Sequence, residues 1–257
     1  MSALIETKSI SKHFEGLAAV QTVNFRVEQG RVAGLIGPNG SGKTTLFNLL
    51  SGLFRPTDGK VIFQGKDITK LAPHKRVEMG IARTFQLVSV FNSLTAWENL
   101  ILSNIKFKEE NRTVRRFFFV SAQNKKVQED CLAALEMVGL QEKAATQTSE
   151  LSYGDKRMLE IAIGLSLKPT LLLLDEPLAG LSDHEIGEVL DIIHRVKENF
   201  TLAIIEHKIS KIIDMVDSLS VMNYGQIICE GHPEQVLCDP AVRECYWGKE
   251  EDACSTS

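Results

Sequence analysis

A glycine-rich segment at residues 37–44 has the composition of a phosphate-binding loop. It reads Gly-Pro-Asn-Gly-Ser-Gly-Lys-Thr and fits the pattern G-x-x-x-x-G-K-[ST]. Glycines let the backbone turn tightly, so that its N–H groups face phosphate oxygens at a helix N-terminus, where anions are stabilised. We expect Lys43 to reach the β- and γ-phosphates and the Thr44 hydroxyl to bind Mg²⁺. The predicted nucleotide-binding residues are Gly37, Pro38, Asn39, Gly40, Ser41, Gly42, Lys43, Thr44 and Thr45.

The flanking sequence decides between this interpretation and a glycine-rich turn that binds nothing. Residues 32–36 form an apolar run of strand length before the loop, and residues 45–50 suit a helix after it. A preceding strand and a following helix are the context that a phosphate-binding loop requires. The sequence therefore predicts that the chain binds a nucleotide.

Two adjacent carboxylates, Asp175 and Glu176, follow a second apolar run at residues 171–174. Asp175 is placed to hold Mg²⁺, and Glu176 to act as the general base toward an attacking water. A solvated strand end is the alternative interpretation of this pair. His207 follows a third apolar run, at residues 202–205. A lone histidine is often only a packed side chain, but its place at a strand end favours the same site.

The three apolar runs predict strands that are buried on both faces, as in a parallel sheet. Because ligands bind at the carboxyl ends of such strands, we expect the loop, the carboxylates and His207 to converge on one site. Ser182 and Glu185 have the spacing of a capping box and open a predicted helix. Residues 87–167 lack comparable strand runs and show helical periodicity, which predicts an inserted helical subdomain. Residues 219–229 predict a hairpin.

The composition excludes several other classes of protein. The net charge is −4, so the chain lacks the basic field that concentrates nucleic acids or anionic lipids. Its five cysteines form no C-x-x-C pair and are odd in number, which suits reduced thiols in a cytosol. Charged residues interrupt residues 1–10, unlike a signal peptide, and no run approaches the roughly 18 apolar residues of a membrane span. We therefore expect membrane contact only through a partner.

With these motifs in this order, the chain resembles the ABC ATPases. Residues 151–155, Leu-Ser-Tyr-Gly-Asp, stand between the loop and the carboxylates and resemble the family signature L-S-G-G-Q. Tyr153 and Asp155 depart from that form, whereas Ser152 and Gly154, the positions that in the family meet the γ-phosphate of ATP, are intact. Helical periodicity continues after them, which places Ser152 at a helix N-terminus suited to an anion.

Further positions match other motifs of the family. Gln86 resembles the Q-loop glutamine, which senses Mg²⁺ and water, and residues 179–183 resemble the D-loop, although Ser182 stands where many members carry an acidic residue. His207 resembles the switch histidine that contacts the γ-phosphate. Phe14 resembles the aromatic residue that stacks on adenine, with a packed core side chain as its alternative. The resemblance implies a catalytic set of Lys43, Gln86, Glu176 and His207 and a metal set of Thr44, Gln86 and Asp175.

The resemblance also implies the architecture. The fold class is α/β, with a RecA-like P-loop NTPase core that contains a parallel sheet, an N-terminal antiparallel β portion and an inserted α-helical subdomain. The core would comprise residues 1–86 and 168–248, and the helical signature subdomain residues 87–167. Residues 249–257 are polar and predicted to be a disordered tail.

The resemblance spans residues 4–248 and is closest to the ATP-binding subunits of branched-chain amino acid importers. The resemblance rests on the sequence segments 80–86, 94–99, 223–225 and 231–233, together with Val236, residues 239–240 and Tyr246 near the end. The implied activity is hydrolysis of ATP with Mg²⁺ to drive a membrane permease. Urea importers and a lipopolysaccharide exporter have similar ATPases, so the cargo stays open at this point.

In this family two ATPase domains meet head to tail, and each ATP lies between the loop of one and the signature of the other. The implied partners are a second ATPase subunit, identical or a sister chain, and transmembrane permease subunits. The implied location is cytoplasmic, peripheral at the inner face of the cell membrane. The rival class is a soluble ABC ATPase acting on DNA or ribosomes, but such proteins tend to carry two cassettes or long coiled-coil inserts, and this chain shows one cassette and no sustained heptads.

Residues 112–126 form a basic and aromatic stretch within the predicted helical insert. Such a stretch suits contact with a permease or with lipid headgroups. A solvated face that buries a run of phenylalanines is the commoner explanation. We therefore assign no site to it.

Overall fold

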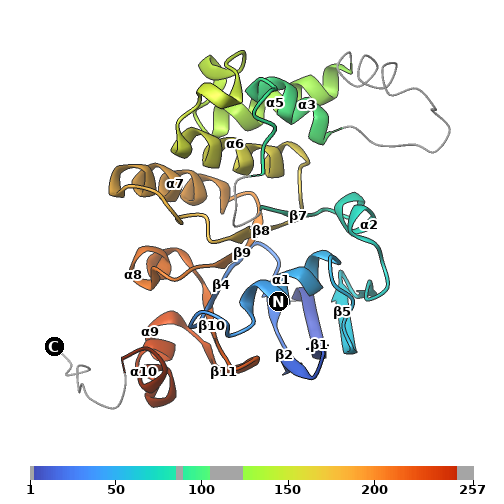
Figure 1. The fold of residues 1–257 in the computed structure, drawn as a ribbon, viewed down its shortest axis with the longest axis vertical. Helices are drawn as coiled ribbons and strands as arrows, with labels where there is room; N and C mark the ends of the chain where they lie inside the picture. Colours follow the sequence, from blue (N-terminus) through green and yellow to red (C-terminus); the bar gives the residue numbers. More distant parts are fainter. Residues whose placement is uncertain (1–2, 85–88, 105–123, 248–257) are drawn as a thin grey trace.

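The computed structural model describes residues 3–84, 89–104 and 124–247 (Figure 1). The predicted Gln86, residues 112–123 of the basic and aromatic stretch, and the predicted tail at residues 249–257 lie outside the described residues. Within the described ranges, the chain forms a six-stranded sheet, a five-stranded sheet and helices that pack on them. The strands are β1 (Ala3–Phe14), β2 (Leu17–Val23), β3 (Arg26–Glu28), β4 (Val32–Ile36), β5 (Asp58–Phe63), β6 (Lys66–Asp67), β7 (Ile81–Arg83), β8 (Leu171–Asp175), β9 (Thr201–Ile205), β10 (Ser218–Asn223) and β11 (Gln226–Gly231).

The six-stranded sheet has the order β11-β10-β4-β9-β8-β7. Its strands from β10 to β7 run parallel, and β11 pairs antiparallel with β10. The three predicted strands, β4, β9 and β8, lie in its middle, and every residue of each is buried. Uninterrupted apolar runs mark such strands because helices or a second sheet cover both faces. The prediction of a parallel sheet is confirmed.

The second sheet is antiparallel and comes from the N-terminal part of the chain. Its strands have the order β2-β1-β5-β6, and β3 also pairs with β1. The expected N-terminal antiparallel portion is therefore confirmed. The register shifts at several points along β1, a long strand that pairs with β2, β3 and β5 over different parts of its length.

Alternate residues of the parallel strands face two different core clusters, because successive strand side chains point to opposite faces of a sheet. Leu171 and Leu173 pack with α1 (Lys43–Ser51) and with the antiparallel sheet. Leu172 and Leu174 pack with helices on the other face, above all α6 (Tyr153–Ser166) and α7 (Asp183–Val196). Packing on both faces holds each strand in place, and so it also fixes the position of the strand end from which the next loop starts.

The chain between β7 and β8 is helical where the structure describes it, as predicted. Its helices α3 (Ala96–Ser103), α5 (Lys125–Met137) and α6 pack on one another and share the core cluster of α7 and the parallel sheet (Figure 1). The other helices of the described ranges are α2 (Pro73–Glu78), α8 (Ile209–Ile212), α9 (Pro233–Leu237) and α10 (Pro240–Trp247), with 3₁₀ turns η1 (Gln141–Lys143), η2 (Thr148–Glu150) and η3 (Ile213–Met215).

Helix starts follow the capping residues of the sequence. The Ser182 side chain accepts a hydrogen bond from the Glu185 N–H, and the Glu185 side chain bonds back to the Ser182 N–H, so the predicted capping box is confirmed. The hairpin predicted at residues 219–229 is confirmed as β10 and β11. None of the helices in the described ranges is both long and apolar enough to cross a membrane.

Candidate functional site

Glycines shape the loop between β4 and α1 because the backbone there leaves no room for a Cβ atom. Gly42 has a φ of 106°, and a Cβ on it would lie 2.3 Å from the Ala19 carbonyl oxygen. A Cβ on Gly37 would lie 2.1 Å from the Met222 carbonyl oxygen. Both distances are far below any real contact, so the loop depends on glycine at these positions. The N-terminus of α1 opens at Lys43, directly after Gly42.

Lys43 is held inside this loop by its own backbone. Its Nζ donates to the carbonyl oxygens of Gly37, at 2.8 Å, and Pro38, at 2.9 Å. Burial lowers the pKa of the ammonium, and the carboxylates of Glu176 and Asp175 act in the opposite direction. The influence of both carboxylates on Lys43 shows that the ends of β4 and β8 converge, as the sequence predicts. The ammonium can exchange its carbonyl partners for phosphate oxygens without leaving the loop.

Asp175 ends β8, and the residues that the structure describes give a partner to only one of its two carboxylate oxygens. Its Oδ2 accepts from Nη2 of Arg83 at 2.7 Å, and its backbone N–H donates to the Thr84 hydroxyl at 3.3 Å. Its Oδ1 is buried and has no hydrogen-bond partner among the described residues. Burial raises the pKa of this carboxyl, and Arg83 opposes that rise. An unpartnered buried carboxylate oxygen beside the Thr44 loop fits a hard divalent cation.

Arg83 is a residue of this site that the sequence interpretation missed. Its Nη1 donates to Asn48 Oδ1 at 2.7 Å and to Ser51 Oγ at 3.2 Å, both on α1, while Nη2 binds Asp175. The guanidinium therefore links the loop helix to the end of β8 in a fixed planar arrangement. The available signal was an arginine at the end of an apolar run, Ile81-Ala82-Arg83, three positions before Gln86.

Glu176 and His207 face each other across the ends of β8 and β9. The distance between Glu176 Oε1 and His207 Nε2 is 2.5 Å. Glu176 has a φ of 50°, a left-handed conformation that is uncommon for a residue with a side chain. Such strain persists only where the surroundings impose it, and it gathers at functional sites. The surrounding fold therefore imposes the Glu176 conformation that brings its side chain to His207.

A hollow of about 580 Å³ brings the predicted residues together. The predicted residues that line it are Asn39, Gly40, Gly42, Lys43, Thr44, Thr45, Glu176 and His207. Gly37, Pro38 and Ser41 complete the loop behind this lining, with Gly37 and Ser41 buried. Ser152 and Gly154 are described by the structure but are not part of this lining. The arrangement can bind a polyphosphate and place a carboxylate and an imidazole beside it.

The signature residues lie at the N-terminus of α6. The Ser152 side chain caps this helix by accepting from the Asp155 N–H at 3.0 Å. Asp155 binds Lys143 at 2.7 Å. Burial raises the pKa of the Asp155 carboxyl, but hydrogen bonds from Lys143 and Ser152 outweigh it and hold that pKa below its usual range. The predicted position of Ser152 at a helix N-terminus is confirmed.

Two contacts connect the signature residues to the loop before α7 and to the first turn of α7 in the same chain. The Tyr153 ring lies against Gly180, where an added Cβ would be 3.0 Å from Tyr153 Cε1. Gly154 lies against the Glu185 carboxylate, which would have to shift to admit a Cβ, since that atom would be 2.5 Å from Glu185 Oε1. The Gly154 N–H also helps to lower the pKa of Glu185, after the larger effect of the Ser182 hydroxyl.

A family model described as ABC transporter matches residues 20–179 of this chain. The match includes the glycine loop, the signature residues and both carboxylates. The chain belongs to the ABC transporter family. As an ABC ATPase, it binds and hydrolyses ATP.

Known ABC ATPases match this one over nearly their whole length. The high-affinity branched-chain amino acid transport ATP-binding protein BraF of Pseudomonas aeruginosa is 36% identical over 250 residues, which cover 96% of this chain and 98% of BraF. LivG of Escherichia coli strain K12, of the same description, is 35% identical over 251 residues, with 96% and 98% covered. Among solved structures, the ADP conformation of MJ1267, an ATP-binding cassette of an ABC transporter, has a TM-score of 0.85 and 32% identity, with 97% and 100% covered.

Phe14, the predicted adenine partner, lies at the end of β1 outside the lining of the 580 Å³ hollow. The residue is 37% exposed, and its ring packs edge to face on Phe54, with 5.3 Å between the ring centroids. Lys12 Nζ lies 5.0 Å from the Phe14 ring centroid. Leu17 and Ala18, which follow Phe14 closely in the sequence, do line the hollow. The stacking role of Phe14 stays a prediction.

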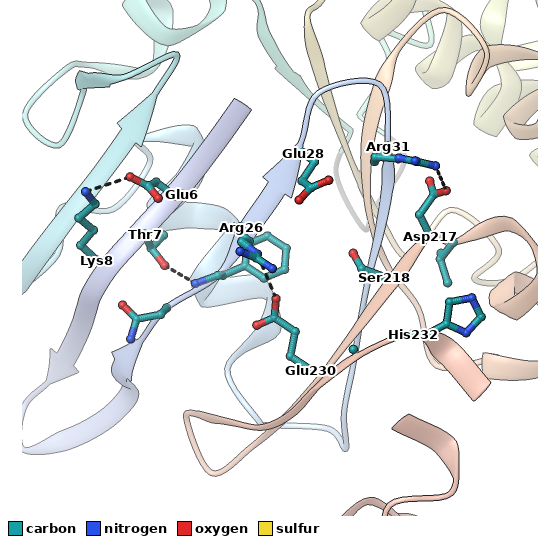
Figure 2. A pocket seen from close by; sticks show the side chains of 14 residues that line it. Glu6, Thr7, Lys8, Arg26, Glu28, Arg31, Asp217, Ser218, Glu230 and His232 are labelled. Atoms are coloured by element: carbon teal, nitrogen blue, oxygen red, sulfur yellow. Dashed lines mark hydrogen bonds and ion pairs between the residues drawn. The ribbon is translucent and has the colours of Figure 1, made fainter. Parts of the chain in front are cut away.

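A larger polar hollow of about 1060 Å³ lies where β4 and β10 begin, at the opposite end of the parallel strands (Figure 2). Beside Glu28, Figure 2 shows charged side chains joined in pairs. Lys8 lies 3.0 Å from Glu6, Arg31 lies 2.8 Å from Asp217, and Arg26 lies 3.8 Å from Glu230. These pairs neutralise one another, so the hollow offers little net charge to a ligand. Size alone does not make it the functional site of this ABC ATPase.

Proposed function

We propose that this ABC ATPase powers the import of branched-chain or other hydrophobic amino acids through partner permeases. BraF and LivG, whose names describe branched-chain amino acid transport, support this cargo because they match 96% of the chain at 36% and 35% identity. The observation that best supports ATP hydrolysis at this site is the hollow that Lys43, Glu176 and His207 line together.

Within this proposal each residue of the hollow has one task. Lys43 binds the β- and γ-phosphates, and the loop N–H groups at the start of α1 hold the remaining phosphate oxygens. Glu176 takes a proton from the attacking water, and His207 contacts the γ-phosphate and holds the Glu176 carboxylate. Thr44, Asp175 and Gln86 would hold Mg²⁺, which supplies charge neutralisation at the phosphates when it is bound.

A second ATPase subunit completes the site in this proposal. The lining of the hollow contains neither Ser152 nor Gly154, although both stand at a helix N-terminus suited to an anion. A second copy or a sister chain, placed head to tail, would supply these two residues from outside. Catalysis by positioning then requires closure of the pair, which couples hydrolysis to movement. Residues 87–167 would move as the signature-bearing unit against residues 1–86 and 168–248.

The proposal places the chain at the inner face of the cell membrane, held there by permease subunits. Its net charge of −4 gives no general attraction to anionic lipid. Contact with the membrane would therefore be indirect.

Reconstitution with partner subunits tests this function. The chain would be co-expressed and co-purified with candidate permease and substrate-binding subunits of an amino acid importer and placed in liposomes. Uptake of labelled leucine that depends on ATP, and that stops when Glu176→Gln replaces the wild-type chain, is the expected result. Uptake of urea but not leucine would overturn the cargo, and an ATPase that never co-purifies with permeases would overturn the transport role.

A further inference from the structure

Glu206 is a buried carboxylate that the family motifs leave without a role. It follows β9, directly before His207, and is 2% exposed. Burial raises the pKa of its carboxyl, and the N–H groups of Leu178, His207 and Lys208 oppose the rise. Burying a carboxylate is costly unless its oxygens are hydrogen-bonded, so its partners show what it does.

The two oxygens of Glu206 bind two different loops. Oε1 accepts from the Leu178 N–H at 2.8 Å, in the loop after β8. Oε2 accepts from the His207 N–H at 3.0 Å, with the Lys208 N–H at 3.5 Å, in the loop after β9. Strands β8 and β9 are neighbours in the sheet (Figure 1), so one side chain spans the gap between their ends.

The hydrogen bond from the Leu178 N–H to Glu206 restrains the loop directly after Glu176, because the residue between them is Pro177. Proline has no N–H, so Leu178 carries the first backbone donor after Glu176 itself. The Glu176 N–H donates to the Ile205 carbonyl at 3.0 Å. The loop after β8 is thus fastened to the end of β9 on both sides of Pro177, once by backbone and once by Glu206.

We infer that Glu206 is a positioning residue that holds the Glu176 loop and the His207 loop together, so that these two side chains meet at 2.5 Å. The left-handed φ of 50° at Glu176 needs such an external restraint. The inference rests on the proposed function, in which Glu176 is the general base. Glu206 acts through Glu176 and His207.

Glu206→Gln tests this with little change in shape. The variant puts an NH₂ donor against a backbone N–H in either orientation of the amide. With Mg²⁺ and ATP, kcat of the full-length protein is expected to fall roughly tenfold or more, while KM changes by less than about twofold because the phosphate loop is untouched. The exposed Glu198→Gln is the matched control and is expected to behave as wild type.

A double-mutant cycle separates positioning from a general effect on the fold. In a His207→Ala background, Glu206→Gln is expected to lower kcat by less than about twofold, because the contact that it supports is already gone. The imidazole ¹⁵N resonances of His207, recorded without nucleotide, give a readout that does not need activity. Glu206→Gln and Glu176→Gln are expected to shift the Nε2 resonance in the same direction.

The inference fails if Glu206→Gln costs the same factor in both backgrounds, retains wild-type turnover, or leaves the His207 resonance in place. If that variant does not fold, Glu206→Asp keeps the charge but shortens the reach by one methylene, and wild-type turnover in it would be equally decisive. Failure of the proposed function looks different: the wild-type chain would hydrolyse no ATP, or Glu176→Gln would turn over normally, while the His207 resonance would still respond to Glu206.

Discussion

Arg83 and Asp175 form an ion pair of 2.7 Å whose side chains are only 6% and 1% exposed. The two residues are separated by 92 positions in the chain and meet because β7 and β8 are parallel neighbours. Arg83 also binds Asn48 and Ser51 of α1. One guanidinium therefore connects the helix after the phosphate loop to the strand end that carries the carboxylates.

Arg83→Met is expected to lower the free energy of unfolding by about 3 kcal/mol, because it leaves a buried carboxylate without its cation. Urea denaturation measures the loss. Adding Asp175→Asn to Arg83→Met is expected to restore part of it by removing the unpaired charge, which a loss of packing alone would not allow. The exposed Arg195→Met is the control, expected within about 0.5 kcal/mol of wild type.

Glu176→Gln is expected to bind ATP and to lower turnover by a factor of about 100 or more, because the amide cannot take a proton from water. The ATP-bound pair of subunits then accumulates, which size-exclusion chromatography with and without ATP detects. Glu188→Gln, on the exposed face of α7, should leave turnover and elution unchanged. Unchanged steady-state turnover in Glu176→Gln would remove the general-base assignment.

Ser152→Arg is expected to abolish hydrolysis while the affinity of the monomer for nucleotide stays the same, since the hollow that contains Lys43 does not include Ser152. Fluorescent nucleotide binding and phosphate release measure the two separately. The lost helix cap is expected to cost about 1 kcal/mol of stability. Ala133→Arg, exposed on α5, adds the same charge elsewhere on the insert. Loss of binding together with hydrolysis would count against completion of the site by a second subunit.

Asp155→Asn is expected to destabilise the start of α6 in a pH-dependent way. The native pKa of Asp155 lies below its ordinary value of 3.8, so the carboxylate stabilises the folded state at neutral pH. This contribution disappears as the pH falls below 3.8 and through the native pKa. The difference in unfolding free energy between wild type and Asp155→Asn should therefore be about 1 kcal/mol at neutral pH and shrink in acid. A difference that is constant with pH, or one shared by the exposed Asp191→Asn, would contradict this account.

The buried parallel strands β4, β8 and β9 could be predicted from the sequence because each contains an uninterrupted run of apolar residues or glycine, at 32–36, 171–174 and 202–205. Strand β4 was predicted with the bounds that the structure gives it, Val32–Ile36. Strands β1 and β2 were not predicted individually, because half-exposed strands with register shifts break the alternating pattern on which such predictions depend. Strand β7 has only three residues, too few for periodicity.

The residues of the candidate site also fall into those that the sequence could predict and those that it could not. Lys43, Asp175 and His207 could be found because each is marked by its neighbours in the sequence, a glycine loop or an apolar run. Arg83 and Glu206 could not, since their partners are set by which strands lie side by side. A lone arginine or glutamate beside a short apolar run does not reveal a contact made with a residue far along the chain.

The Tyr153 ring packs directly over Gly180. The tyrosine stands where related signatures carry glycine, and its ring fills the space over Gly180 that any side chain at position 180 would need. Gly180 also has a φ of 76°, which most other residues would adopt only under strain. A side chain at position 180 would therefore displace the exposed Tyr153 ring, and a smaller residue at 153 would remove that contact but not the strain of the positive φ, so glycine at 180 serves both the backbone and the tyrosine.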